Sequence, residues 1–267
     1  MVIDLHHHVG DVGPMSARGD VAPKGLEEDI LTRLAYLDRN GIDQCVLMPS
    51  NGSPSPHGFE DRKRDNDAIA AYRDREPKRF VAALGSVDPK DGALALDEID
   101  RCIEELGVAG IVWHHRFLGV PINHPFMHPL LDRLAHHGVP AFIHVIAEST
   151  FEAPWRLEAL AEVHSDVTFV ALDGFSGVSQ CQWMTHIARR NSNIFFDTGV
   201  LISVSHMLDN FINVVGAERL LFGSDFYSTP ELFKVPYPLS EIGAMELSPD
   251  DRAAILGGNA RKLLGMS

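Results

Sequence analysis

The 267-residue sequence contains only three cysteines, and they lie far apart in the chain. Cys45, Cys102 and Cys181 form no CxxC pair, and each falls inside a segment with the pattern of a strand or a helix. An odd and dispersed set of this kind argues against a disulfide framework and against a cysteine zinc site. It is typical of a reducing compartment, and we expect a cytoplasmic protein.

Long hydrophobic runs and an excess of positive charge are also lacking. No run of about 20 apolar residues occurs, and no basic segment precedes an apolar one at the start, so neither a membrane span nor an export signal is predicted. The chain has 23 Lys and Arg against 37 Asp and Glu, a net charge of −14. We therefore expect no broad surface for nucleic acid or anionic membranes, and a small molecule as the partner.

Short apolar segments rich in β-branched and aromatic residues recur along the chain, and a segment of helical period follows nearly every one. The predicted strands are Val2–His6, Gln44–Met48, Phe80–Val87, Gly110–His114, Ala141–Val145, Thr168–Leu172, Asn193–Asp197 and Arg219–Phe222. The predicted helices are Leu26–Asn40, Asp67–Glu76, Leu94–Leu106, Pro129–His137, Trp155–His164, Gln180–Arg190, Val204–Val215 and Pro249–Leu264. Eight βα units predict an α/β fold, a (β/α)8 TIM barrel forming a single domain over residues 1–267.

Turn and cap residues mark several boundaries of these elements. Gly41, Gly107 and Gly138 follow the last turns of their predicted helices, and Ser248-Pro249 is a plausible helix start. Residues 9–24 and 50–65 are rich in Gly, Pro and Ser, and we expect two long loops there, over the catalytic face.

The first predicted strand carries alternating polar side chains. Asp4, His6 and His8 are expected to share one face, with His7 on the other. His144 ends the fifth predicted strand and Asp225 follows the eighth, and functional side chains of a TIM barrel project from these carboxyl ends. We therefore predict that His6, His8, His144 and Asp225 bind a divalent metal ion and leave one position open for water.

A single ion is expected, because Val112 stands at the fourth strand and no lysine ends a predicted strand to bridge two metals. Imidazole-rich ligation favours Zn²⁺, with Mn²⁺, Fe²⁺ or Ni²⁺ as alternatives. Metal-bound water would attack a carbonyl with Asp225 as the general base, so hydrolysis of a small amide, ester or lactone is the first functional prediction.

Other polar residues end predicted strands at the same rim. His114 ends the fourth, Asp173 follows the sixth and Asp197 ends the seventh. An aspartate at such a place often serves as a turn or cap residue, and Asp197 is interpreted as structural. Arg116 is a candidate clamp for a substrate carboxylate, and an exposed loop arginine is the alternative. His114 and Arg116 are the predicted substrate-binding residues.

Several segments in a fixed order match motifs of a known family. They are Asp4-Leu5-His6-His7-His8, Asn66 through Val87-Asp88-Pro89, Gly110 to His114, Pro140 to His144, Leu221 to Asp225, and Gly257 to Ala260 with Leu263-Leu264-Gly265. In these the chain resembles the amidohydrolase superfamily, and specifically the amidohydrolase-2 branch that includes aminocarboxymuconate-semialdehyde decarboxylase-like enzymes, lactonases and hydratases. The resemblance implies a barrel with one metal held by His6, His8, His144 and Asp225, and a possible homodimer.

The chain departs from that family at two places. The family usually has a histidine at the end of the sixth strand, where this sequence has Asp173, either as a metal or water partner, and so a second catalytic candidate, or as a structural turn residue. His115 replaces a common proline and is expected to add a basic group beside His114 and Arg116.

Three alternatives to hydrolysis stay open. The same metal would also serve non-oxidative decarboxylation of an unsaturated or aromatic carboxylic acid, in which an acid delivers a proton to carbon. A degenerate barrel acting as a scaffold is a second alternative, although the complete ligand set argues against it. A histidinol-phosphatase-like phosphoesterase also begins with His-x-His but fits the Gly-Ser-Asp segment at 223–225 poorly.

Overall fold

A computed structural model describes residues 1–10, 25–50, 57–201, 205–229 and 231–266. Its strands are β1 (Ile3–Val9), β2 (Gln44–Pro49), β3 (Phe80–Ala83), β4 (Ile111–Trp113), β5 (Ala141–His144), β6 (Phe169–Leu172), β7 (Ile194–Asp197), β8 (Leu220–Leu221), β9 (Phe226–Ser228) and β10 (Glu231–Leu232). Its helices are α1 (Leu26–Arg39), α2 (Phe59–Arg73), η2 (Pro89–Asp91), α3 (Ala93–Glu104), α4 (His115–Leu118), α5 (Met127–His137), α6 (Pro154–Val163), α7 (Val178–Arg190), α8 (Ser205–Val215), α9 (Tyr237–Ala244), α10 (Pro249–Ala253), η3 (Ala254–Gly258) and α11 (Asn259–Leu263).

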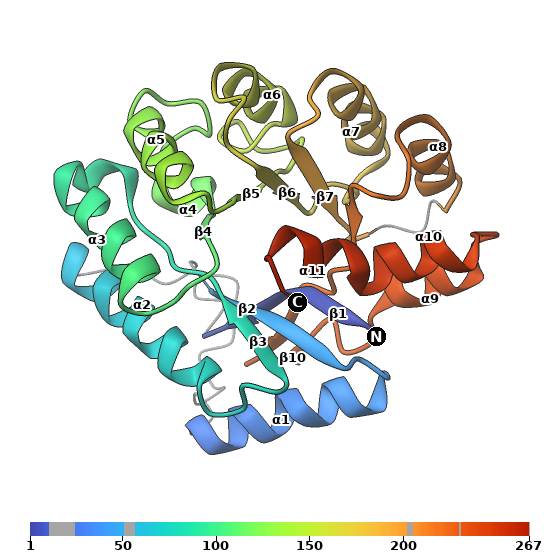
Figure 1. Cartoon of the computed structure of the whole chain (residues 1–267), viewed down its shortest axis with the longest axis horizontal. Helices are drawn as coiled ribbons and strands as arrows, with labels where there is room; N and C mark the ends of the chain where they lie inside the picture. Colours follow the sequence, from blue (N-terminus) through green and yellow to red (C-terminus); the bar gives the residue numbers. More distant parts are fainter. Residues whose placement is uncertain (11–24, 51–56, 202–204, 230, 267) are drawn as a thin grey trace.

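The strands form a ring that the helices surround (Figure 1). Two sheets, in the orders β10-β9-β1-β2-β3 and β4-β5-β6-β7-β8, are parallel except for the β9/β10 pair. A bridge between Gly85 and Ile111 joins the sheets on one side. On the other side the backbone N–H of Leu5 donates to the carbonyl of Phe222 at 2.9 Å. The predicted (β/α)8 TIM barrel is confirmed.

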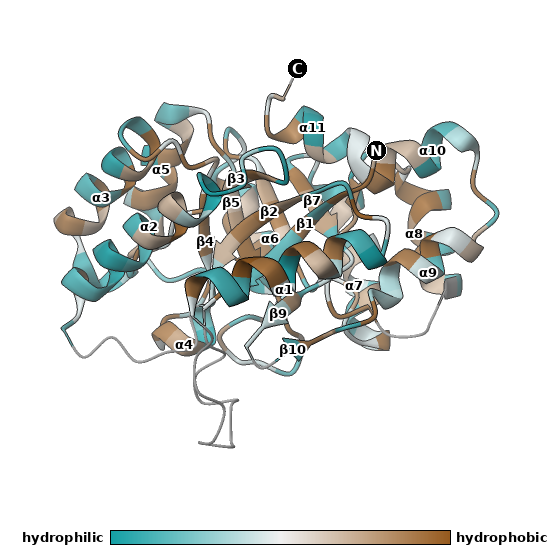
Figure 2. Ribbon diagram, turned by 90° about the horizontal axis from the view of Figure 1, so that it is seen from below, coloured by the Kyte–Doolittle hydropathy of each residue, from teal (hydrophilic) through white to brown (hydrophobic). Residues whose placement is uncertain are grey.

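Side chains alternate between an inner and an outer layer along the strands. Val46, Val112, Phe142 and Val170 belong to a cluster that fills the interior of the ring. Their neighbours in sequence, such as Leu47, pack in a second cluster between strands and helices. This alternation follows from the two-residue period of a strand. In Figure 2 the inner strands are largely brown, and α1 alternates between brown and teal as an amphipathic helix does.

Strand β1 interrupts this alternation. Its pairing with β2 matches Asp4 with Cys45 and His7 with Leu47, so β1 has one more residue than β2 over this interval, which is a β-bulge. Cys45 and Leu47 belong to the outer layer. Asp4 and His7 therefore both lie on the outer side, and the prediction that Asp4 shares the face of His6 and His8 is wrong. A one-residue bulge moves every later side chain to the opposite face.

Several predicted boundaries hold, and others move. Gly41, Gly107 and Gly138 have the positive φ expected after a helix, and the Ser248 hydroxyl accepts from the backbone N–H of Asp251 at 3.0 Å. Helix α2 begins at Phe59, so the latter part of the predicted 50–65 loop is helical. Residues 11–24 and 51–56 of the predicted loops, and Val204 of a predicted helix, lie outside the described residues.

Other differences concern the segments after β4 and β8. Helix α4, the β9/β10 hairpin and helix α9 were not predicted. The predicted helix Pro249–Leu264 is divided into α10, η3 and α11, with a non-helical backbone at Gly257 (φ 178°, ψ −26°). A Cβ on Gly257 would lie 2.7 Å from the carbonyl oxygen of Met1. Both termini lie at one end of the barrel, and α4, β9 and β10 lie at the other (Figure 2). Among the described helices, none is long and apolar enough to span a lipid bilayer.

Candidate metal centre

Three histidine side chains converge at the carboxyl ends of β1 and β5. The Nε2 atoms of His6 and His8 are 2.9 Å apart, and one ring nitrogen from each of His6, His8 and His144 lies within 4.8 Å of the others. All three side chains are buried. The Nδ1 atom of His144 donates to the carbonyl of Trp113 at 3.0 Å, which leaves its buried Nε2 without a hydrogen-bond partner among the residues described. A buried nitrogen with a free lone pair is suited to bind a cation.

Asp225 completes the cluster from the segment between β8 and β9. Its Oδ1 lies 3.3 Å from Nε2 of His6 and 3.2 Å from Nε2 of His8. The residue has a φ of 58°, a left-handed conformation that aspartate tolerates better than most residues. Donor separations of this size match the edges, about 3.0–3.4 Å, of a coordination shell with bonds of about 2.1 Å. The separations among His6, His8 and Asp225 are therefore those of a single coordination shell, and a ring nitrogen of His144 lies within 4.8 Å of the two histidine nitrogens.

Asp197 contacts the His6 ring at Nδ1, the nitrogen that faces away from His8. One of its carboxylate oxygens accepts a hydrogen bond from Nδ1 of His6 at 2.7 Å, and the other accepts from the backbone N–H of Asp173 at 2.7 Å. With the proton held on Nδ1, the lone pair of Nε2 faces the cluster, as in a carboxylate–histidine–metal arrangement. The interpretation of Asp197 as a turn or cap residue missed this contact, because it joins β7 to β1.

The electrostatics of the cluster favour a positive charge. Burial alone lowers the pKa of His6, but the carboxylates of Asp197 and Asp225 outweigh it and raise the pKa to about 10. Burial, with repulsion from neighbouring imidazoles, lowers the pKa of both His8 and His144 well below the ordinary value. The imidazoles of His8 and His144 are therefore neutral donors, and a divalent cation would take the place of the His6 proton that faces the carboxylates.

Asp173 lies beside this cluster, at the end of β6. Its Oδ1 is 3.8 Å from Nδ1 of His6 and has no hydrogen-bond partner within the described part of the chain. Burial raises its pKa, the charge of His6 opposes that effect, and Asp197 adds to it; the resulting pKa is about 7. His6, Asp173 and Asp225 also place one donor atom each within 4.8 Å of one another. Both roles expected for Asp173 in the site, catalytic and metal-binding, therefore stay open.

The predicted substrate-binding residues border the cluster on the side of β4. The ring of His114 stacks on that of His144 with centroids 4.1 Å apart and planes 3° from parallel. Nδ1 of His114 is 2.5 Å from Oε1 of Glu152, which also accepts from the backbone N–H of Arg116 at 3.0 Å. The Arg116 side chain is 30% exposed, with NH1 3.7 Å from Glu152. Glu152 was missed because it lies between β5 and α6, away from any strand end.

His115 differs from its prediction. Its side chain is fully buried, with Nδ1 2.9 Å from the carbonyl oxygen of Val120, and Nε2 has no hydrogen-bond partner among the described residues. Burial lowers its pKa from 6.5 to about 4. It is therefore neutral at pH 7, and the expected additional basic group beside Arg116 is absent.

The lowered pKa of His115 predicts a specific loss of stability in acid. Between pH 6.5 and about 4 the unfolded chain binds a proton that the folded chain does not, so stability present above pH 6.5 falls as the pH drops. We expect His115→Gln to reduce this loss by up to about 3 kcal/mol, since each pKa unit corresponds to about 1.4 kcal/mol. Chemical denaturation at several pH values measures the free energy of unfolding of each variant, and His206→Gln, at an exposed histidine, is the control. Parallel pH profiles for the wild type and His115→Gln would show that His115 does not cause the loss of stability in acid.

Two glycines that the sequence analysis did not single out enclose the His6–Asp197 pair. A Cβ on Gly223 would lie 2.5 Å from Oδ2 of Asp197 and 2.8 Å from Cβ of His6. A Cβ on Gly199 would lie 2.5 Å from Nδ1 of His6. No side chain fits at either position unless this pair moves.

We therefore expect Gly223→Ala to weaken metal retention by at least about tenfold, because disturbing the partner of a metal-binding histidine typically has that effect. Gly243→Ala is the control, since a Cβ there meets nothing within 4 Å. Metal content after dialysis against a graded chelator series measures the effect. Equal retention by both variants would show that the Gly223 contact does not matter for the metal.

Comparisons with known proteins agree with this fold. A family model described as Amidohydrolase matches residues 3–266. In an alignment of 322 positions, the chain is 23% identical to a 2-amino-3-carboxymuconate-6-semialdehyde decarboxylase of Dictyostelium discoideum, covering 99% of this chain and 85% of the relative. It is 34% identical over 86 residues to a gamma-resorcylate decarboxylase of Rhizobium radiobacter, 30% of this chain and 25% of that protein. A dihydroxybenzoic acid decarboxylase from Polaromonas sp., solved with bound manganese and the inhibitor 2-nitroresorcinol, superposes with a TM-score of 0.75 at 20% identity, covering 99% and 97% of the two chains.

Proposed function

The chain belongs to the amidohydrolase family, and on that basis we propose that it is a divalent-metal-dependent decarboxylase of a small unsaturated or aromatic carboxylic acid. The observation that carries the proposal is the similarity, over 99% of the chain, to a decarboxylase. The sequence analysis placed carbonyl hydrolysis first and decarboxylation second. The comparisons favour the reverse order, because decarboxylases recur among both the relatives and the structural neighbours.

In this proposal His6, His8, His144 and Asp225 hold one divalent ion. The bound manganese of the Polaromonas structure supports Mn²⁺ beside the Zn²⁺ that the ligand types suggested. When bound, the ion supplies Lewis acidity that orients and polarises the oxygen atoms of the substrate. The buried Nε2 of His144 and the short separations between donors support this ligand set.

Residues around the ion would bind the substrate. The partly exposed guanidinium of Arg116 is suited to the substrate carboxylate, because arginine presents paired N–H donors to two oxygens. Glu152 accepts from the backbone of Arg116 and contacts Nδ1 of His114, so it fixes both residues at the edge of the cluster. Nδ1 of His114 is thereby engaged, and its other ring nitrogen can meet the substrate.

Asp173 is suited to deliver the proton that decarboxylation requires. As the bond between carbon and the carboxylate breaks, the electron pair stays on the carbon, carbon dioxide leaves, and the carbon takes a proton from the Asp173 carboxyl. Burial raises the pKa of this group to about 7, so a protonated fraction exists at neutral pH. Solvent then restores the proton to Asp173.

Hydrolysis of an amide, ester or lactone is the second candidate function, because the same metal donors, with Asp225 as the general base, would also serve that reaction.

Product analysis separates the two candidates. We expect the manganese-loaded protein to release carbon dioxide from dihydroxybenzoates or unsaturated amino acids of the carboxymuconate type, with no oxygen from ¹⁸O-labelled water in the organic product. Prior treatment with a chelator should abolish the reaction, and added Mn²⁺ should restore it. Oxygen incorporation from labelled water without carbon dioxide release would instead establish hydrolysis.

Asp173→Asn tests the proton donor. We expect turnover to fall by at least about 100-fold, the usual contribution of a general acid, while metal content stays at the wild-type level. Asp74→Asn changes an exposed aspartate elsewhere and should leave both quantities unchanged. Loss of metal together with turnover in Asp173→Asn would show that Asp173 is a ligand and not the acid.

A further inference from the structure

Behind the metal cluster, on the outer side of β1, lies a fully buried arginine. Arg33 of α1 has no exposed side-chain surface. Its NH2 donates to the carbonyl of His8 at 2.8 Å and to the Ser228 hydroxyl at 3.1 Å, and Nε donates to the Tyr72 hydroxyl at 3.2 Å. The nearest carboxylate, Asp29, is 3.6 Å away. A buried guanidinium needs such partners for its five N–H groups.

The remaining partner of Arg33 is the imidazole of His7. NH1 of Arg33 lies 3.1 Å from Nδ1 of His7, and a guanidinium can only donate, so Nδ1 must accept. The proton of this imidazole is therefore on Nε2, which lies 2.8 Å from Oδ2 of Asp4. This close contact does not have hydrogen-bond geometry, and neither atom has a hydrogen-bond partner among the described residues, so the two polar groups face each other. Arg33 thus selects the tautomer of His7 that can contact Asp4.

Asp4 links this chain of contacts to both metal-bearing segments. Its Oδ1 accepts from the backbone N–H of His6 at 3.2 Å and from that of Ser224 at 2.9 Å. His6 is a proposed ligand, and Ser224 directly precedes Asp225, which is another. Arg33 also holds the carbonyl of His8 directly. One side chain on α1 therefore contacts, directly or through His7 and Asp4, the backbone at or beside three of the four donors.

We propose that Arg33 is a positioning residue of the metal centre, fixing the spacing of His6, His8 and Asp225 through His7, Asp4 and the His8 carbonyl. The inference rests on the proposed function in taking these residues as ligands. The β1 bulge makes the arrangement possible, because it places Asp4 and His7 together on the outer side.

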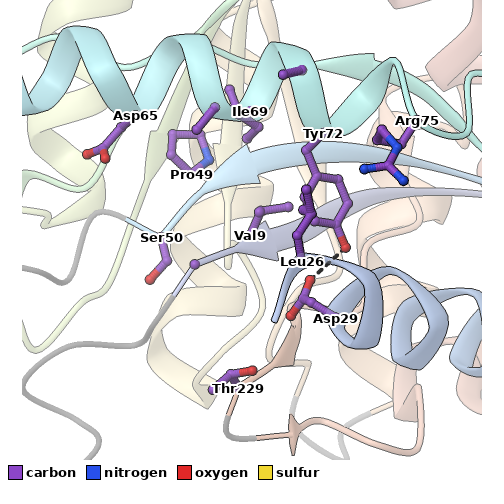
Figure 3. Close-up of a pocket in the computed structure, with 13 residues that line it drawn as sticks. Val9, Leu26, Asp29, Pro49, Ser50, Asp65, Ile69, Tyr72, Arg75 and Thr229 are labelled. Carbon is purple, nitrogen blue, oxygen red and sulfur yellow. Dashed lines mark hydrogen bonds between the residues drawn. The ribbon is translucent and has the colours of Figure 1, made fainter. Parts of the chain in front are cut away.

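Two residues that contact Arg33, Tyr72 and Asp29, also line a cavity between α1 and α2. The Tyr72 hydroxyl donates to Asp29 at 2.6 Å, and both residues line a space of about 630 Å³ (Figure 3). Asp29 also accepts from the Ser228 hydroxyl. None of the proposed metal ligands lines this space. The partners of Arg33 therefore come from α1, α2, β1 and β9, and those on α1, α2 and β9 hold its side chain from outside the metal centre.

The test compares cobalt binding by metal-free preparations of the full chain. We expect Arg33→Met to weaken Co²⁺ affinity by at least about tenfold and to shift the visible absorption of bound cobalt, because the donors lose their spacing. Arg33→Lys should give an intermediate loss of Co²⁺ affinity, since a single ammonium group cannot reach all the acceptors that the guanidinium of Arg33 contacts. The control is Arg219→Met, which removes a partly buried arginine that donates to the carbonyls of Ala188 and Asn191. It should lower the unfolding temperature and leave cobalt affinity and spectrum unchanged.

A second pair of variants keeps the test informative if Arg33→Met does not fold. His7→Gln retains an acceptor and a donor and should keep near wild-type affinity, whereas His7→Leu should reproduce the cobalt defect. Wild-type affinity and spectrum in folded Arg33→Met, or in His7→Leu, would overturn the proposal. Wild-type protein that binds no cobalt would instead contradict the proposed function, so the two failures are distinguishable.

Discussion

The extra residue in β1 is the constraint on which the candidate site depends. Below the bulge, Ile3 and Leu5 face the apolar interior of the barrel, and above it His6 and His8 face the same way. Without the bulge, His6 and His8 would both point outward, and His7 alone would face the interior. The same shift places Asp4 and His7 on the outer side, where they meet Arg33. One backbone irregularity thus builds both the ligand pair and its support.

The rim of the barrel combines features that a stable core alone would not select. Three buried imidazoles and several buried carboxylates lie directly above an apolar layer, and one nitrogen of His144 has no hydrogen-bond partner in the described part of the chain. Asp173 and Asp225 adopt left-handed backbone conformations there. Burial of such groups is costly unless they are paired or bound to a cation, and strained residues concentrate where function requires them. The inner layer below, with Val112 at the fourth strand, provides the rigid base on which this arrangement rests.

The sequence predicted the barrel, and it predicted the positions of four candidate donors at one rim, because both depend on local patterns. Apolar segments of strand length recur, and polar residues follow their carboxyl ends, so His144 and Asp225 could be placed at one rim with His6 and His8. Asp4 was misplaced because strand alternation gives no sign of a bulge. Glu152 and Arg33 were missed because they contact the site from a loop and from a helix, and the neutral state of His115 depends on tertiary burial. Contacts between distant segments are what a single sequence does not express.

The central claim is that His6, His8, His144 and Asp225 converge on a single divalent cation. Anomalous diffraction from crystals of the manganese-loaded protein tests it most directly. The account predicts one strong anomalous peak per chain, bonded to three imidazole nitrogens and one carboxylate oxygen at about 2.0–2.2 Å. A peak bound elsewhere, or full occupancy by manganese with these four side chains outside bonding distance, would contradict it.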